Sequence, residues 1–136
     1  MADALQADSL EASVTVAQLE RSVAWYCDAL GFVVDRKHER EGHWVAASLR
    51  AGAVRILLSQ DDGTKGVGRT KGEGISLQIT TSQSAEDIAA RLVAHGTSLD
   101  LDPTRTPWGM TVLRVRDPDG FRLTISSTHV RDGREG

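Results

Sequence analysis

A chain of 136 residues with 40% hydrophobic and 26% charged residues lies in the ordinary range for one globular domain. The only cysteine, Cys27, excludes a disulfide framework and a cysteine-based zinc site. No window approaches the ~20 apolar residues that a membrane span needs. A net charge of −3 with interleaved signs argues against binding to nucleic acid.

The first nine residues and the single cysteine predict a cytoplasmic protein. Residues 1–9 have neither a basic stretch nor a long apolar core, so no secretory signal is expected. A lone free cysteine is typical of a reducing compartment.

The first half of the chain predicts one strand, one helix and three further strands. Apolar and polar residues alternate over 10–16, as in a half-buried strand. Apolar residues then recur at helical spacing over 19–30, and Gly31 follows as a candidate left-handed residue at the helix end. Strand patterns follow at 32–37, 44–49 and 54–59.

The second half repeats this order. Residues 75–80 alternate as a strand, and an apolar helical stripe over 85–93 follows, with Ser84 and Asp87 spaced as a capping box and Gly96 as the stop. Strand patterns occur at 98–101, 110–116 and 121–126, and Asp117-Pro118-Asp119-Gly120 forms a tight-turn signal before the last of them.

The repeated order predicts an α+β fold of two βαβββ modules that form a cupped, incomplete β-barrel with the helices outside. We expect a single domain over 1–136, with module one at about 9–60 and module two at about 74–127. The segment 61–73 between them is rich in Gly, Asp, Lys and Thr, as in an exposed linker. Small ligands bind preferentially in concave sites, so the cup is the expected site.

Two motifs resemble the vicinal oxygen chelate superfamily, which includes glyoxalase I, extradiol dioxygenases and bleomycin-binding resistance proteins. Residues 21–32, Arg-Ser-Val-Ala-Trp-Tyr-Cys-Asp-Ala-Leu-Gly-Phe, are similar to the family's Ser-x-x-Phe-Tyr-x-x-x-Leu-Gly-Phe helix end. Pro107-Trp108-Gly109, followed by residues 116–121, is similar to its closing hairpin. These motifs are structural, so they identify the fold rather than the chemistry.

The resemblance implies a divalent metal in the enzymes of the family, held by His, Gln or Glu from both modules. The four ligand positions fall here at Glu11, Leu57, Gly74 or its neighbour, and Thr124. Only Glu11 is a good ligand, whereas a divalent cation needs three or four oxygen or nitrogen donors. We therefore expect no metal and no cofactor; a divalent metal bound by Glu11, with Glu73 as partner, is the alternative.

The remaining charged and histidine residues are interpreted as structural. His38 and His43 flank a charged hairpin tip, His95 suits a helix C-terminus, and His129 lies in the polar tail. Alternation along the strands explains the cluster of Arg114, Arg116 and Arg122 as a solvated face rather than a phosphate-binding stripe.

The expected function is that of a metal-independent small-molecule-binding protein of the glyoxalase/bleomycin resistance type, such as one that sequesters antibiotics. Trp44 and Trp108 are candidates to line the mouth of the cup by stacking, although packing roles are the alternative for both. The predicted ligand-binding residues are Glu11, Trp44, Leu57, Arg105, Trp108, Met110 and Thr124.

An enzyme is the alternative class. It would be a glyoxalase-like lyase, an isomerase or a dioxygenase with a diverged site, in which Glu11 acts as a general base or as a metal ligand. Partners are expected to be a small organic ligand and a second copy of the chain, because family members of this size usually form homodimers and exposed strand edges need cover; neither nucleic acid nor a membrane is expected.

Overall fold

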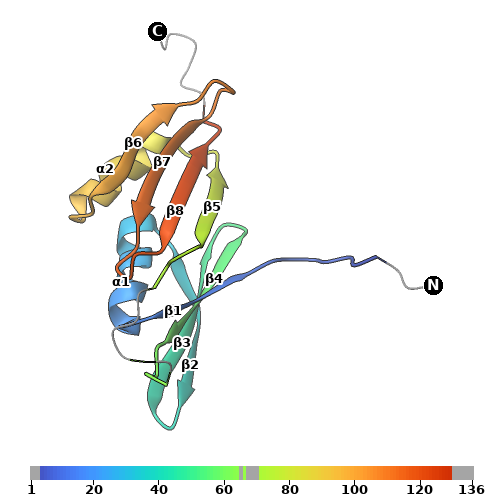
Figure 1. The fold of residues 1–136 in the computed structure, drawn as a ribbon, viewed down its shortest axis with the longest axis vertical. Helices are drawn as coiled ribbons and strands as arrows, with labels where there is room; N and C mark the ends of the chain where they lie inside the picture. Colours follow the sequence, from blue (N-terminus) through green and yellow to red (C-terminus); the bar gives the residue numbers. More distant parts are fainter. Residues whose placement is uncertain (1–3, 65, 67–70, 130–136) are drawn as a thin grey trace.

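The computed structural model describes residues 4–64, 66 and 71–129, which form two four-stranded sheets and two helices (Figure 1). The elements follow the predicted order, β-α-β-β-β twice. Module one contains β1 (Ala12–Val16), α1 (Leu19–Leu30), β2 (Val33–Arg40), β3 (His43–Ala51) and β4 (Val54–Gln60). Module two contains β5 (Ser76–Thr81), α2 (Ala85–Ala94), β6 (Leu99–Arg105), β7 (Thr111–Arg116) and β8 (Arg122–Ser127).

Each module forms its own mixed sheet. Sheet A has the strand order β1-β4-β3-β2 and sheet B has the order β5-β8-β7-β6. In both sheets the first strand pairs with the last one in parallel, and the other neighbours are antiparallel. The predicted α+β fold of two cupped modules is confirmed, and the sheets do not close into a barrel.

The helix ends have the predicted local signals. Gly31 lies at φ 88°, and its N–H donates to the carbonyl of Cys27 over 3.1 Å. At the start of α2, the Ser84 hydroxyl accepts from the Asp87 backbone N–H over 3.2 Å. The end of α1 and the start of α2 therefore lie where these capping residues direct.

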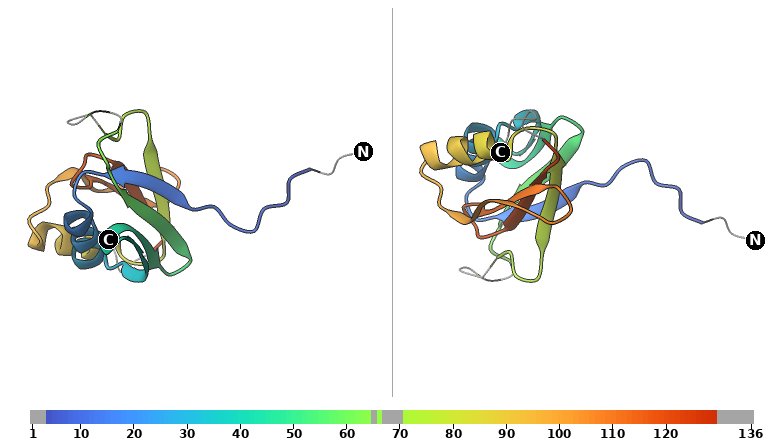
Figure 2. Two further views of the ribbon diagram at one scale, coloured as in Figure 1. Left: turned by 90° about the horizontal axis from the view of Figure 1, so that it is seen from below. Right: turned by 90° about the horizontal axis from the view of Figure 1, so that it is seen from above.

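The core lies between the helices and one face of each sheet. Both helices lie on the same side of the molecule (Figure 2). Val14 and Val16 in sheet A, and Leu123 and Ile125 in sheet B, are buried in this core. Because side chains alternate along a strand, the residues between them lie on the opposite face of each sheet, away from α1 and α2 (Figure 2). We call these two surfaces open face A and open face B.

A hydrogen-bond network around Asp117 and Asp119 links the two modules. The hydroxyl of Tyr26 on α1 donates to Asp117 Oδ2 over 2.8 Å, and both side chains are buried. Asp119 accepts from the backbone N–H of Ala17 over 3.0 Å and from the Ser22 hydroxyl over 3.2 Å. The turn before β8 thus holds the start of α1 and sets the relative position of the two sheets.

Strand β6 is longer than the predicted 98–101, since it runs to Arg105 and includes Pro103. Proline has no backbone N–H, so a strand interior usually excludes it. Here β6 is an edge strand, and its ladder to β7 is irregular between Leu101 and Thr104, which leaves Pro103 unpaired.

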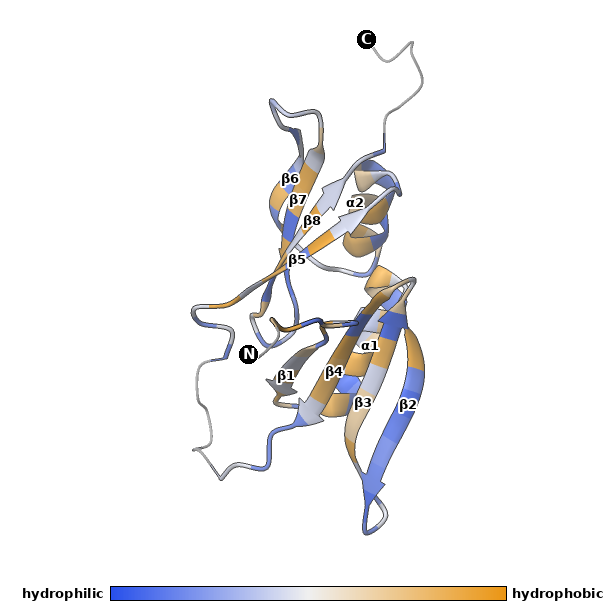
Figure 3. Cartoon of the chain, turned by 90° about the vertical axis from the view of Figure 1, so that its right-hand side faces the viewer, coloured by the Kyte–Doolittle hydropathy of each residue, from blue (hydrophilic) through white to orange (hydrophobic). Residues whose placement is uncertain are grey.

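The two edges of sheet A differ in character. Strand β2, at one edge of sheet A, is hydrophilic over most of its length (Figure 3), as expected of an edge that discourages pairing. At the other edge, β1 is preceded by an extended arm, residues 4–11, that projects away from the body in Figures 1 and 2. Leu5 and Leu10 in this arm are 89% and 96% exposed.

Candidate functional site

Open face A carries an apolar centre with small polar neighbours. The ladder places Leu57 on β4 directly between Ser13 on β1 and Ser48 on β3. Ser48 Oγ lies 3.2 Å from Nε2 of His38, which extends the polar contacts to β2. This part of the face can therefore contact an apolar group at Leu57 and hydrogen-bond polar groups beside it.

One carboxylate next to this centre is shared by two arginines. Asp35 lies in an irregularity of β2, and its carboxylate is 2.6 Å from Nη1 of Arg55 and 3.8 Å from Nε of Arg50. The two arginines face each other across β3 and β4. Arg55 is therefore occupied by an ion pair within the chain.

Open face B is built from rows of residues that the ladders align across β5, β8 and β7. One row contains Gln78, Thr124 and Arg114. The next contains Ser76, Arg122 and Arg116, and a third contains Thr80, Ser126 and Val112. Thr124, at one of the positions implied by the resemblance, thus lies between an amide and a guanidinium group.

Trp44 lies on the core face of sheet A. The ladder between β2 and β3 pairs His38 with Ala46 and Glu39 with Trp44, so Val45 is an extra residue in β3. Such a bulge reverses the alternation, and Trp44 packs against the core. Lys37 Nζ lies 4.6 Å from the centre of its ring, and its buried indole nitrogen has no hydrogen-bond partner in the described part of the chain.

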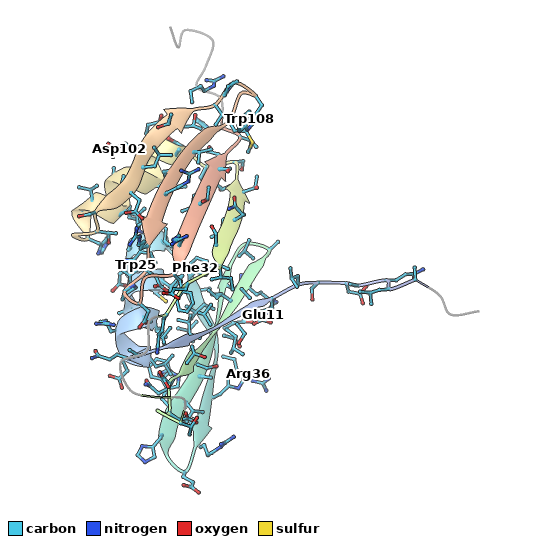
Figure 4. The ribbon with its side chains drawn as sticks, viewed as in Figure 1. Glu11, Trp25, Phe32, Arg36, Asp102 and Trp108 are labelled. Atoms are coloured by element: carbon cyan, nitrogen blue, oxygen red, sulfur yellow. The ribbon has the colours of Figure 1, made fainter. Side chains whose placement is uncertain are left out.

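The other predicted residues of the mouth belong to the hairpin between β6 and β7. Arg105 ends β6, Trp108 is 72% exposed in the loop, and Met110 is bonded back to Thr106 through its backbone. Figure 4 shows Trp108 at the far end of sheet B from Glu11, which lies beside sheet A. Within one chain these two predicted residues are not brought together.

Glu11 and Glu73, the proposed metal pair, differ in their surroundings. Glu73 lines a cavity of about 670 Å³ together with Ser13 and Thr15, whereas Glu11 is exposed at the base of the arm and is not among the lining residues. Gly74, at the third implied ligand position, is exposed and has φ 72°.

The donor set does not suit a divalent cation. Across residues 4–64, 66 and 71–129, no three His, Cys, Asp or Glu side chains come together as a group able to hold a metal ion. Leu57 is flanked by serines, and Thr124 lies beside Arg114, whose positive charge opposes a second cation.

The four histidines lie at separate places and do not form one site. His38 contacts Ser48, and His43 is exposed opposite Arg40 beside the tight turn of Glu41 and Gly42, both at positive φ. His95 follows the end of α2. His129 is exposed and lines a small cavity next to α2.

A second cavity, of about 540 Å³, lies where the two modules meet. Its apolar lining includes Phe32, Ile79 and Ile125, and Arg91 borders it. The Arg91 Nε donates to the carbonyl of Asp28 over 3.0 Å, which ties α2 to α1. This charge therefore serves the contact between the helices.

Two βαβββ modules with helices on one side and open sheet faces on the other define the class of protein. The chain belongs to the Glyoxalase/Bleomycin resistance protein/Dioxygenase superfamily, whose family profile matches residues 8–125. The family resemblance predicted from the two motifs is confirmed. Among residues 4–64, 66 and 71–129 there is no helix long and apolar enough to cross a membrane.

Solved structures share this fold. A glyoxylase/bleomycin resistance protein/dioxygenase domain from Frankia sp. EAN1pec has a TM-score of 0.73 and 24% identity, with 96% of each chain covered. TioX from Micromonospora sp. ML1 has a TM-score of 0.70 and 19% identity, covering 90% of this chain and 99% of TioX. Lactoylglutathione lyase from Agrobacterium tumefaciens has a TM-score of 0.66 and 17% identity, covering 90% and 95%. At these identities the likeness is one of fold alone, and no curated protein matches the chain.

Proposed function

We propose that the chain is a metal-independent small-molecule-binding protein of the bleomycin resistance type, with antibiotic sequestration as its role. One observation carries this: Leu57 occupies the centre of open face A between two serines, at a position where the family's enzymes would carry a metal donor. An apolar centre with hydroxyl neighbours favours binding of an organic molecule by contact and hydrogen bonding. The single free cysteine is consistent with a cytoplasmic location.

Binding is tested by calorimetric titration with a panel of cationic, neutral and anionic antibiotics that includes bleomycin. Leu57→Lys is expected to weaken binding of any ligand that rests on open face A by about tenfold or more, because burial of an unpaired charge costs free energy. Val93→Lys is the matched control, since Val93 is 58% exposed on α2. If no panel member binds, or if both variants bind as the unmodified chain does, the proposal fails.

The alternative is a metal-dependent lyase, isomerase or dioxygenase that uses Glu11. This alternative is favoured by Glu11, which is the one carboxylate among the four ligand positions that the family resemblance implies. Metal analysis of protein purified without chelators separates the two functions. A stoichiometric divalent ion that is lost in Glu11→Gln would favour the enzyme, whereas the metal-independent function predicts the same background content in both proteins.

We propose further that two copies of the chain form a homodimer. The projecting arm supports this, because Leu5 and Leu10 expose apolar surface that a second copy would cover. The outer edges of β1 and β5 are unpaired within their sheets, which adds backbone hydrogen-bonding groups in need of a partner.

Light scattering after size exclusion is expected to give twice the 14.7 kDa mass of one chain. Leu5→Asp/Leu10→Asp should shift the dissociation constant upward by roughly tenfold or more, because each leucine buried at an interface contributes about 1.5–3 kcal/mol. A matched pair of substitutions on the exposed strand β2, Arg36→Asp/Arg40→Asp, should leave the mass unchanged. A monomeric unmodified chain would refute the homodimer.

A further inference from the structure

Three arginines lie together on open face B. Arg114 and Arg116 alternate along β7 with Leu113 and Val115, which are buried in the core. The ladder sets Arg116 directly opposite Arg122 on β8. All three arginines are exposed. The sequence predicts a solvated face for these arginines, and the strand register brings them together as one cluster on open face B.

This cluster is only partly neutralised. Asp100 Oδ2 lies 2.8 Å from Nε of Arg116, but across residues 4–64, 66 and 71–129 neither Arg114 nor Arg122 has an ion pair. Like charges directly opposite one another destabilise a sheet. The chain as a whole carries a net charge of −3, so its overall composition does not account for positive charge gathered here.

On β5 and β8 the neighbours of the arginines are neutral hydrogen-bonding groups, whereas β6, on the other side of β7, carries Asp100 and Asp102. Gln78 and Thr124 share a row with Arg114, and Ser76 shares one with Arg122. None of the strands β5, β7 and β8 contains an acidic residue. Guanidinium groups present paired N–H donors that match carboxylate and phosphate oxygens, and amide and hydroxyl groups can complete the contacts.

We propose that open face B binds the anionic group, a carboxylate, phosphate or sulfonate, of a small organic molecule through Arg114 and Arg122. The inference rests on the proposed small-molecule-binding function and narrows its ligand class. Arg116, held by Asp100, contributes positive charge beside the bound anion, whereas the two arginines without an ion pair donate to it. The repulsion between Arg116 and Arg122 is relieved when the anion is bound.

The test uses two dyes of similar shape and one inorganic anion. Fluorescence titration compares anionic 1-anilinonaphthalene-8-sulfonate with neutral N-phenyl-1-naphthylamine, and calorimetry measures inorganic pyrophosphate. Arg114→Gln/Arg122→Gln is expected to weaken binding of the anionic dye and of pyrophosphate by roughly tenfold or more, because hydrogen bonds to charged groups are the strong ones. Binding of the neutral dye should not change. The matched control is Arg40→Gln, at an exposed position of β2.

The outcomes separate the two proposals. Loss of anion affinity in the double variant with unchanged neutral-dye binding supports the anion site, and thermal unfolding should occur at the same temperature or higher because repulsion is removed. If pyrophosphate binding depends on the arginines but neither dye binds, the anion site stands and the proposed binding of larger organic ligands fails. Unchanged or absent binding of both anionic probes overturns the inference. Conversion of a dimer to a monomer by the double variant also overturns it, because the arginines would then contact a second copy of the chain and not a small anion.

Discussion

Tyr26→Phe is expected to lower the free energy of unfolding by roughly 1.5–3 kcal/mol, the range for a buried hydrogen bond to a charged group. Tyr26 is fully buried, and its hydroxyl donates to Asp117 Oδ2 over 2.8 Å. The phenylalanine ring keeps the edge-to-face contacts with Trp25 and Phe32, so only the hydrogen bond is removed. Urea unfolding followed by circular dichroism measures the change.

Thr104→Val provides a control, because the Thr104 hydroxyl is exposed and donates to the nearby carbonyl of Asp102. Its effect should stay within about 0.5 kcal/mol, as for most surface substitutions. Equal effects of the two variants would contradict the importance of the junction between the modules.

The same junction predicts a pH dependence of stability. Burial raises the pKa of the Asp117 carboxyl. The hydrogen bonds that it accepts from Tyr26, Phe121 and Asp119 lower this pKa, but burial has the larger effect. The folded chain therefore holds this proton more tightly than the unfolded chain does. Between the ordinary carboxyl pKa and the raised one the folded state binds more protons, so the contribution of Asp117 to stability falls as the pH rises through that window. Asp117→Asn should remove this part of the pH dependence in urea unfolding from about pH 4 to pH 7.

Gly72→Ala is expected to destabilise the chain by roughly 2–4 kcal/mol, because left-handed backbone strain and a steric clash act together. Gly72 lies at φ +83°, and an added Cβ would stand 2.7 Å from the Gly120 carbonyl oxygen and 3.0 Å from the Phe121 Cα. Both contacts are to backbone, which cannot move aside as a flexible side chain does. The linker would have to separate from the turn before β8.

Gly74→Ala is the matched control for this substitution. Gly74 lies at φ +72° with nothing within 4 Å of an added Cβ, so only the backbone strain of about 1–2 kcal/mol is expected. Thermal unfolding of both variants measures the difference. A loss in Gly72→Ala no greater than in Gly74→Ala would show that the close approach does not contribute.

Local signals explain why much of the fold could be predicted from the sequence. A left-handed glycine such as Gly31 and a capping serine such as Ser84 act within a few residues, so their effect can be predicted without knowledge of the fold. Trp44 is different, because its side chain changes face through one extra residue, Val45, and no sequence pattern marks a bulge of this kind. Its assignment to the mouth of the cup remains a prediction that this placement does not support.

The candidate site depends on pairings between distant residues. The sequence alone assigns Asp117 to a tight turn, whereas the structure pairs it with Tyr26, 91 residues away. Arg116 and Arg122 are close in sequence, but only the register reveals that they lie directly opposite each other. Alternation predicts which residues share a face of one strand, and strand pairing decides which residues meet on the sheet.

The parallel pairing of the first and last strands has a consequence for how the chain folds. Ala12 pairs with Ile56, a separation of 56 − 12 = 44 residues, and Ser76 pairs with Arg122, a separation of 122 − 76 = 46 residues. Closing a loop of this length costs entropy before any contact offsets it, so each sheet is completed only when its last strand arrives. During synthesis, module one can close as soon as β4 has left the ribosome, while β5 stays without its partner in sheet B until β8 has been made.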